Sequence, residues 1–124
     1  MKVLVIEHLE KERMKITSTL RLKGHEVFEA INTDEAMEIF KKKYRLNMII
    51  LNLEIPTIDG ISLCRSLKSM SPPPILMLAN EVTKEIKKQG TKVGVWKWLL
   101  RPISDKVLLE TIQSLPTTDQ EIIL

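Results

Sequence analysis

A chain of 124 residues is long enough for one domain with a sizeable core, and its 44% hydrophobic and 28% charged residues are ordinary for a water-soluble globular protein. The single cysteine, Cys64, excludes an internal disulfide and fits a reducing compartment, and no apolar run approaches the roughly 20 residues of a membrane span. We therefore expect a cytoplasmic protein without membrane contact. The net charge of +3 is mildly basic, and the lysines at 41–43 and within 82–90 fit solvated helix faces better than a nucleic-acid surface.

Two kinds of segment alternate along the chain. Short apolar runs without polar alternation indicate parallel strands that are covered by helices on both faces. Such runs occupy 3–6, 48–51 and 75–78, and further strands are predicted at 25–29 and, as an edge strand, at 95–99. Segments with apolar residues at helical spacing follow them, over 10–23, 34–44, 60–70, 82–90 and 104–115. The weakest strand is 25–29, with Val27 as its apolar centre, and the poorest helix is 82–90.

Single residues predict where several helices begin and end. Gly24 ends the first helix, and Asn32 or Thr33 caps the second. Ser104 is the expected cap of the last helix. The apolar face of the first helix is predicted to comprise Met14, Thr17, Leu20 and Leu22.

Five strands, each followed by a helix, predict an α/β fold in which helices cover both faces of a doubly wound parallel sheet. We expect one domain over residues 1–116 and a C-terminal tail over 117–124. Ligands of such sheets bind beyond the carboxyl ends of the strands. The residues at these ends are Glu7, His8, Asn52, Ala79, Asn80 and Leu100 to Pro102.

Four segments resemble the receiver domain of two-component response regulators. KVLVIEH is similar to the first strand of that family, IILNLEIPTIDG to the third, ILMLAN to the fourth and GVWKWLLRPI to the fifth, and they occur in this order. The resemblance covers residues 2 to about 115. It implies a flavodoxin-like fold, with a five-stranded parallel sheet of order 2-1-3-4-5 and five helices.

The resemblance also implies a site, because the family transfers a phosphoryl group from a histidine kinase to an aspartate with the help of Mg²⁺. The family's acidic pair, acceptor aspartate, Ser/Thr hydroxyl and lysine correspond here to Glu7, His8, Asn52, Ala79 and Arg101. The amide of Asn52 is neutral and cannot form a stable acyl phosphate, and His8 is a poor ligand for Mg²⁺. We therefore expect a degenerate pseudo-receiver, which is not an enzyme and has no metal or other cofactor, and in which Glu7 contacts Arg101.

The family's fourth helix, fifth strand and fifth helix form the surface used for partners or dimerisation. Trp96 and Trp98 are two residues apart in a predicted edge strand, so we expect them to face the same side of the sheet. The predicted interaction surface joins them with the lysines Lys84, Lys87, Lys88 and Lys97. It would bind a partner protein, an output domain or a second copy. The alternative is that both tryptophans pack against the fourth helix.

The function expected from these features is two-component or phosphorelay signalling by protein contact, independent of phosphorylation. Two alternatives stay open. One is a phosphorelay receiver with an atypical active pocket, and the other is a basic nucleic-acid-binding module.

Overall fold

In the computed structural model the chain is described over residues 1–42, 45–55 and 59–115. These residues form the strands β1 (Lys2–Ile6), β2 (Glu26–Ala30), β3 (Met48–Asn52), β4 (Ile75–Ala79) and β5 (Val95–Leu100). The helices are α1 (Glu10–Leu22), α2 (Thr33–Lys41), α3 (Gly60–Lys68), α4 (Lys84–Lys92) and α5 (Asp105–Gln113). Lys43, Pro56 of the IPTIDG motif and the predicted tail 117–124 lie outside the described residues.

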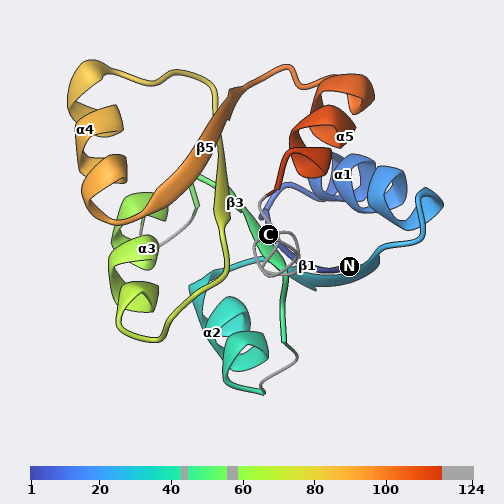
Figure 1. Ribbon diagram of the computed structural model, residues 1–124, viewed down its shortest axis with the longest axis horizontal. Coiled ribbons are helices and arrows are strands. Elements are labelled where there is room, and N and C mark those ends of the chain that lie inside the picture. Colours follow the sequence, from blue (N-terminus) through green and yellow to red (C-terminus); the bar gives the residue numbers. More distant parts are fainter. Residues whose placement is uncertain (43–44, 56–58, 116–124) are drawn as a thin grey trace, which may run out of the picture.

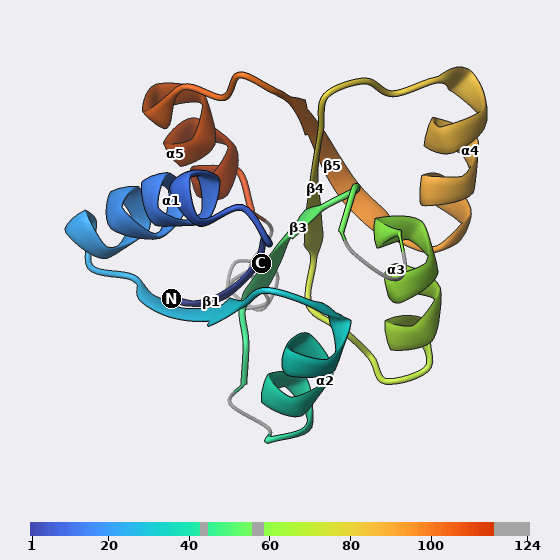
Figure 2. The ribbon, with the colours of Figure 1, turned by 180° about the vertical axis from the view of Figure 1, so that it is seen from behind.

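The five strands form one parallel sheet of order β2-β1-β3-β4-β5, which confirms the predicted fold class and strand order. Helices α1 and α5 cover one face, and α2, α3 and α4 cover the other (Figure 1). The reverse view shows the same two layers on either side of the central strands (Figure 2). Because both faces are covered, every residue of β3 and β4 is buried, as their unbroken apolar runs require.

The predicted helix caps are present. Asn32 Oδ1 accepts a hydrogen bond from the Glu35 N–H at 2.9 Å, so Asn32, not Thr33, caps α2. Ser104 Oγ accepts from the Val107 N–H at 3.1 Å at the start of α5. These contacts span only three residues, which is why local sequence predicted them.

The predicted apolar face of α1 was partly wrong. Met14 and Leu22 are 55% and 86% exposed, whereas Ile16, Thr17 and Leu20 are buried. Ile16 and Leu20 are one helical turn apart and lie on the face that packs on the sheet, and the 3.6-residue repeat turns Met14 and Leu22 away from it. The predicted apolar face was therefore too wide, and it included Met14 and Leu22 from the exposed side of the helix.

The prediction that Trp96 and Trp98 share one side of the sheet was also wrong. Val95 pairs with Ile75 but Lys97 pairs with Leu76, so β5 contains one extra residue there, a β-bulge. The bulge interrupts the two-residue alternation. Trp98 packs on the face covered by α2, α3 and α4, and Trp96 packs on the α1 and α5 face. The alternative of packing against α4 holds for Trp98 alone.

Trp98 determines how closely α4 approaches the sheet. Gly90 is the buried residue of α4, and a Cβ placed on it would lie 2.3 Å from Trp98 Cζ2. A rigid indole cannot yield by that distance without displacing its neighbours. The contact explains why a glycine occurs inside this helix, although glycine is a poor helix former. Few apolar side chains of α4 pack on the sheet, so the close approach to Trp98 matters more.

We predict that Gly90→Ala lowers the free energy of unfolding by about 1–3 kcal/mol, because the overpacking against Trp98 outweighs the higher helix propensity of alanine. Urea denaturation followed by circular dichroism measures the loss. Lys88→Ala, at an exposed position of the same helix, is the matched control and should change stability by less than about 0.5 kcal/mol. In a Trp98→Leu background the effect of Gly90→Ala should largely disappear; an undiminished loss there would contradict the proposed contact.

Candidate functional site

Four strand ends meet at the carboxyl edge of the sheet. Glu7 and His8 follow β1, Asn52 ends β3, Ala79 ends β4 and Arg101 follows β5. Because β1, β3, β4 and β5 are consecutive neighbours in the sheet, their ends lie side by side. A cavity of about 310 Å³ opens there and is lined by His8, Glu12, Asn52, Glu54, Asn80 and Arg101. The structure therefore gathers the five residues predicted for the degenerate pocket, with Glu7 and Ala79 buried beside the cavity.

A buried ion pair dominates this edge. Arg101 Nη2 donates to Glu7 Oε2 at 2.9 Å, which confirms the predicted contact. The side chains of Glu7 and Arg101 are only 1% and 13% exposed. The second carboxylate oxygen, Glu7 Oε1, accepts from the Leu9 N–H at 3.2 Å. Arg101 is held in turn by its own N–H, which donates to the Ala79 carbonyl at 2.9 Å.

Burial raises the pKa of the Glu7 carboxyl above its ordinary value of 4.5. The Leu9 N–H and the positive charge of Arg101 act in the opposite direction and lower the same pKa, but burial is the larger effect. Burial thus opposes the charged form of Glu7, and the Leu9 N–H and Arg101 stabilise it.

Asn52 is also buried, at 3% exposure. Its Oδ1 accepts from the Glu54 N–H at 3.0 Å, so the amide oxygen caps the turn that follows β3. The carboxylate of Glu54 points across to β4, where Glu54 Oε2 accepts from Asn80 Nδ2 at 3.3 Å. Sequence reasoning did not identify this Glu54–Asn80 contact, since it depends on the positions of two loops.

His8 stands at the rim of the cavity, and its side chain is 32% exposed. Its Nδ1 is buried and has no hydrogen-bond partner among the described residues, although it lies 3.8 Å from Glu7 Oε1. The imidazole is therefore close to the Glu7 carboxylate without bonding to it.

The residues at this edge do not fit the Mg²⁺ of the family site. Mg²⁺ needs several hard oxygen ligands in octahedral geometry. Here both oxygens of Glu7 already accept hydrogen bonds, and the guanidinium of Arg101 holds the positive charge beside them. The oxygen of Asn52 caps its own turn. Among the described residues no group of three or more His, Cys, Asp or Glu side chains could hold a metal ion.

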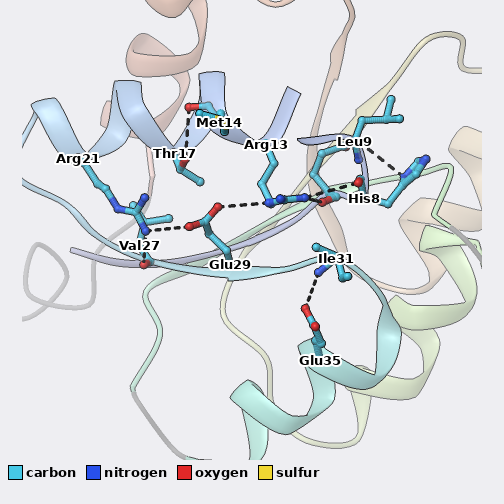
Figure 3. A network of polar contacts seen from close by, with 11 residues as sticks. His8, Leu9, Arg13, Met14, Thr17, Arg21, Val27, Glu29, Ile31 and Glu35 are labelled. Atoms are coloured by element: carbon cyan, nitrogen blue, oxygen red, sulfur yellow. Dashed lines mark hydrogen bonds and ion pairs between the residues drawn. The ribbon is translucent and has the colours of Figure 1, made fainter. Parts of the chain in front are cut away.

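Arg13 of α1 reaches both the turn at His8 and the Glu29 carboxylate (Figure 3). Arg13 Nη1 donates to the Glu7 carbonyl at 3.0 Å, and Arg13 Nε lies 3.3 Å from Glu29 Oε1 on β2. Arg21 Nη2 pairs with the other oxygen of Glu29 at 3.1 Å. Sequence reasoning missed this network. The available signal was two arginines eight residues apart on one helix, beside a strand that carries glutamates.

The residues of the predicted interaction surface are divided by the bulge in β5. Lys84, Lys87 and Lys88 are exposed on α4, and Trp98 packs on that side of the sheet. Lys97 lies with Trp96 on the opposite side, where Lys97 Nζ is 5.3 Å from the Trp96 ring centroid. The predicted single patch is therefore two surfaces that meet at the edge strand.

Within the described part of the chain, none of the helices has the length and apolar character needed to cross a membrane.

Comparison with known proteins agrees with this fold. The family model described as the response regulator receiver domain matches residues 3–113. A probable transcriptional regulator, ycf27, of Porphyra purpurea is 33% identical over 115 residues, which cover 91% of this chain and 46% of the relative. The chain thus spans about half the length of this relative and of its ycf27 counterparts in Porphyridium aerugineum and Pyropia yezoensis.

Solved structures are similar over nearly the whole chain. Vibrio cholerae CheY4, a chemotaxis protein, has a TM-score of 0.87 at 31% identity, covering 93% of this chain and 98% of that one. The BeF3-activated receiver domain of Klebsiella pneumoniae RstA has a TM-score of 0.82 at 21% identity, covering 91% and 96%. The second likeness concerns the fold alone.

We predict that Arg101→Met lowers the free energy of unfolding at neutral pH by about 2–4 kcal/mol, because it leaves the Glu7 carboxylate buried without its cation. Chemical denaturation measures the loss. Arg21→Met, which removes an exposed partner of Glu29, is the matched control and should cost less than about 1 kcal/mol. Adding Glu7→Gln to Arg101→Met should restore much of the stability; a double variant as unstable as the single one would show that charge is not the cause.

The raised pKa of Glu7 predicts a pH dependence with a defined sign. The folded state binds the Glu7 proton more tightly than the unfolded state does, so this group stabilises the fold at pH values below 4.5. That contribution is lost as the pH rises from 4.5 through the raised pKa. The stability of the wild type minus that of Glu7→Gln should therefore fall over this range in denaturation curves recorded at a series of pH values. A difference that rises or stays level would contradict the prediction.

Proposed function

This chain belongs to the family of response regulator receiver domains of two-component signalling, and we propose that it signals by protein contact without accepting a phosphoryl group. In this proposal the chain is a pseudo-receiver and not an enzyme. It needs neither Mg²⁺ nor another cofactor.

The observation that carries the proposal is the 2.9 Å contact between Arg101 and Glu7. Phosphoryl transfer relies on cations that neutralise the transferring group, and on acidic side chains free to hold the metal. Here the acidic side chain is already paired with the cation supplied by the chain itself. A phosphoryl group or a metal would have to break this buried pair before it could bind.

The acceptor chemistry points in the same direction. A phosphoryl group is held on an aspartate through a bond to a carboxylate oxygen, whereas Asn52 presents a neutral amide whose oxygen accepts the Glu54 N–H. Ala79 is fully buried and offers no hydroxyl that could bond a phosphoryl oxygen. Asn52 and Ala79 therefore support a pocket that keeps a single conformation, because neither residue can accept or bond a phosphoryl group.

The charge of α4 supports an acidic protein surface as the partner. The helix contains four lysines and one glutamate, so it alone carries a formal charge of +3, equal to the net charge of the whole chain. Lys84, Lys87 and Lys88 are exposed on it and can steer an acidic partner by long-range attraction. Because the ycf27 relatives are about twice as long and are named probable transcriptional regulators, an output domain is one form that this partner can take.

We predict that the wild-type protein gives no saturable response to Mg²⁺ and BeF3, because the Glu7–Arg101 pair occupies the site and Asn52 cannot act as acceptor. Amide NMR shifts of Glu7 and Asn52 follow the titration in the wild type, and the fluorescence of Trp98 follows it in a Trp96→Phe variant. The RstA receiver, whose BeF3-activated structure is known, is the positive control under identical conditions. Saturable binding by the wild type, with shifts centred on Asn52, would overturn the proposal.

A further inference from the structure

A second cavity lies at the opposite edge of the sheet, where the strands begin. It has a volume of about 520 Å³ and opens between the segment after α2 and the segment after α3. Its apolar walls are formed by Phe40, Leu46, Met70, Pro72 and Pro73. We call this cavity the α2–α3 groove. It shares no residue with the cavity at the carboxyl edge.

The α2–α3 groove has a positively charged rim. Lys41 and Arg45 line it, both are exposed, and neither forms an ion pair with a carboxylate of the described residues. An apolar channel bordered by unpaired cations fits a peptide that combines bulky aliphatic side chains with carboxylates.

The backbone around the groove is unusual as well. Arg45 and Ser71 line it and have φ angles of 56° and 51°. They are the only residues other than glycine with positive φ in the described part of the chain. Such conformations are uncommon outside glycine and tend to occur where a surface has a function. With Pro72 and Pro73 beside Ser71, they give the groove a preformed shape.

The end of α5 brings the following segment to the same edge of the sheet. Lys97 Nζ, near the start of β5, lies 3.3 Å from Ser114 Oγ, just beyond α5. Leu115 belongs to the buried cluster that contains Met48, the first residue of β3. The chain therefore leaves its described part beside the beginnings of the strands, on the α1 and α5 face.

We propose that residues 117–124 bind in the α2–α3 groove of the same molecule. Their sequence, TTDQEIIL, contains the two carboxylates Asp119 and Glu121 followed by the aliphatic residues Ile122, Ile123 and Leu124. The carboxylates match the cationic rim, and the aliphatic side chains match the apolar walls. The segment lies outside the described residues, and its composition is what complements the groove.

Reach and local concentration both favour this occupant over a free peptide. The nine residues 116–124 span up to about 30 Å when extended. Leu115 belongs to the same buried cluster as Met48, and Met48 follows Leu46 of the groove by two residues, so the distance to cover is short. A short tether of this kind gives an effective concentration in the millimolar range, so even a weak site would be filled. A partner segment with the same chemistry would then have to displace residues 117–124.

Paramagnetic relaxation in the full chain tests this proposal. A nitroxide label is attached at Thr118→Cys; the native thiol of Cys64 is fully buried, and burial raises its pKa to about 12, so it does not compete for the label. Methionine methyl signals report the distance to the label. We expect strong broadening of Met70 in the groove and little change of Met14, which is exposed on α1.

Charge reversal separates specific docking from chance proximity. Lys41→Glu should reduce the broadening of Met70 several-fold, and adding Asp119→Lys to it should restore the effect. Lys11→Glu, an exposed reversal on α1, is the matched control and should leave the broadening unchanged.

Three results would overturn the proposal. The first is equal broadening of Met70 and Met14, and the second is broadening that is insensitive to Lys41→Glu. The third is broadening that appears only when labelled and isotope-enriched molecules are mixed, which would make a second copy the occupant. None of these results bears on phosphoryl transfer, so the proposed function is tested separately.

Discussion

The buried ion pair between Glu7 and Arg101 is the contact around which the carboxyl edge of this sheet is arranged. A carboxylate at 1% exposure is costly unless a cation and hydrogen-bond donors accompany it, and Arg101 and the Leu9 N–H supply them. Because Glu7 follows β1 and Arg101 follows β5, the pair connects strands that are separated by β3 and β4. Arg13 completes the arrangement by holding the Glu7 carbonyl from α1. The buried charge of Glu7 is thus compensated by groups of the chain itself.

A second contact determines where α4 lies. Trp98 reaches the helix at Gly90, where the absence of a side chain lets the backbone approach the indole ring. Trp98 faces α4, and Trp96 faces α5, because one extra residue in β5 interrupts the strand's alternation. α4, the most basic of the described helices, is therefore attached to the sheet through the contact of Gly90 with Trp98, and its Ile86 also packs against the core. This arrangement links the edge strand to the surface that we propose for partner binding.

The predictions from sequence were accurate where the cause is local or follows from chain order. Asn32 and Ser104 cap their helices through contacts three residues away, and unbroken apolar runs mark strands buried on both faces. They were wrong where a small geometric change moves a side chain to another face. Met14 and Leu22 were assigned to the buried stripe of α1, although the helical repeat carries them into solvent. Trp96 and Trp98 were assigned to one face from the two-residue alternation of a strand, which the bulge in β5 interrupts.

The sequence by itself determined the fold and the identity of the groups at the carboxyl edge, because parallel strands in a known order must end side by side. It also determined that Glu7 and Arg101 would be the charged residues available to pair there. Only the tertiary structure decided that both oxygens of Glu7 are engaged, that His8 Nδ1 lies beside Glu7 without a hydrogen bond, and that Trp96 and Trp98 lie on opposite faces. The physical reason is that rotamers, turns and bulges are selected by packing between segments distant in the chain, which no local pattern records.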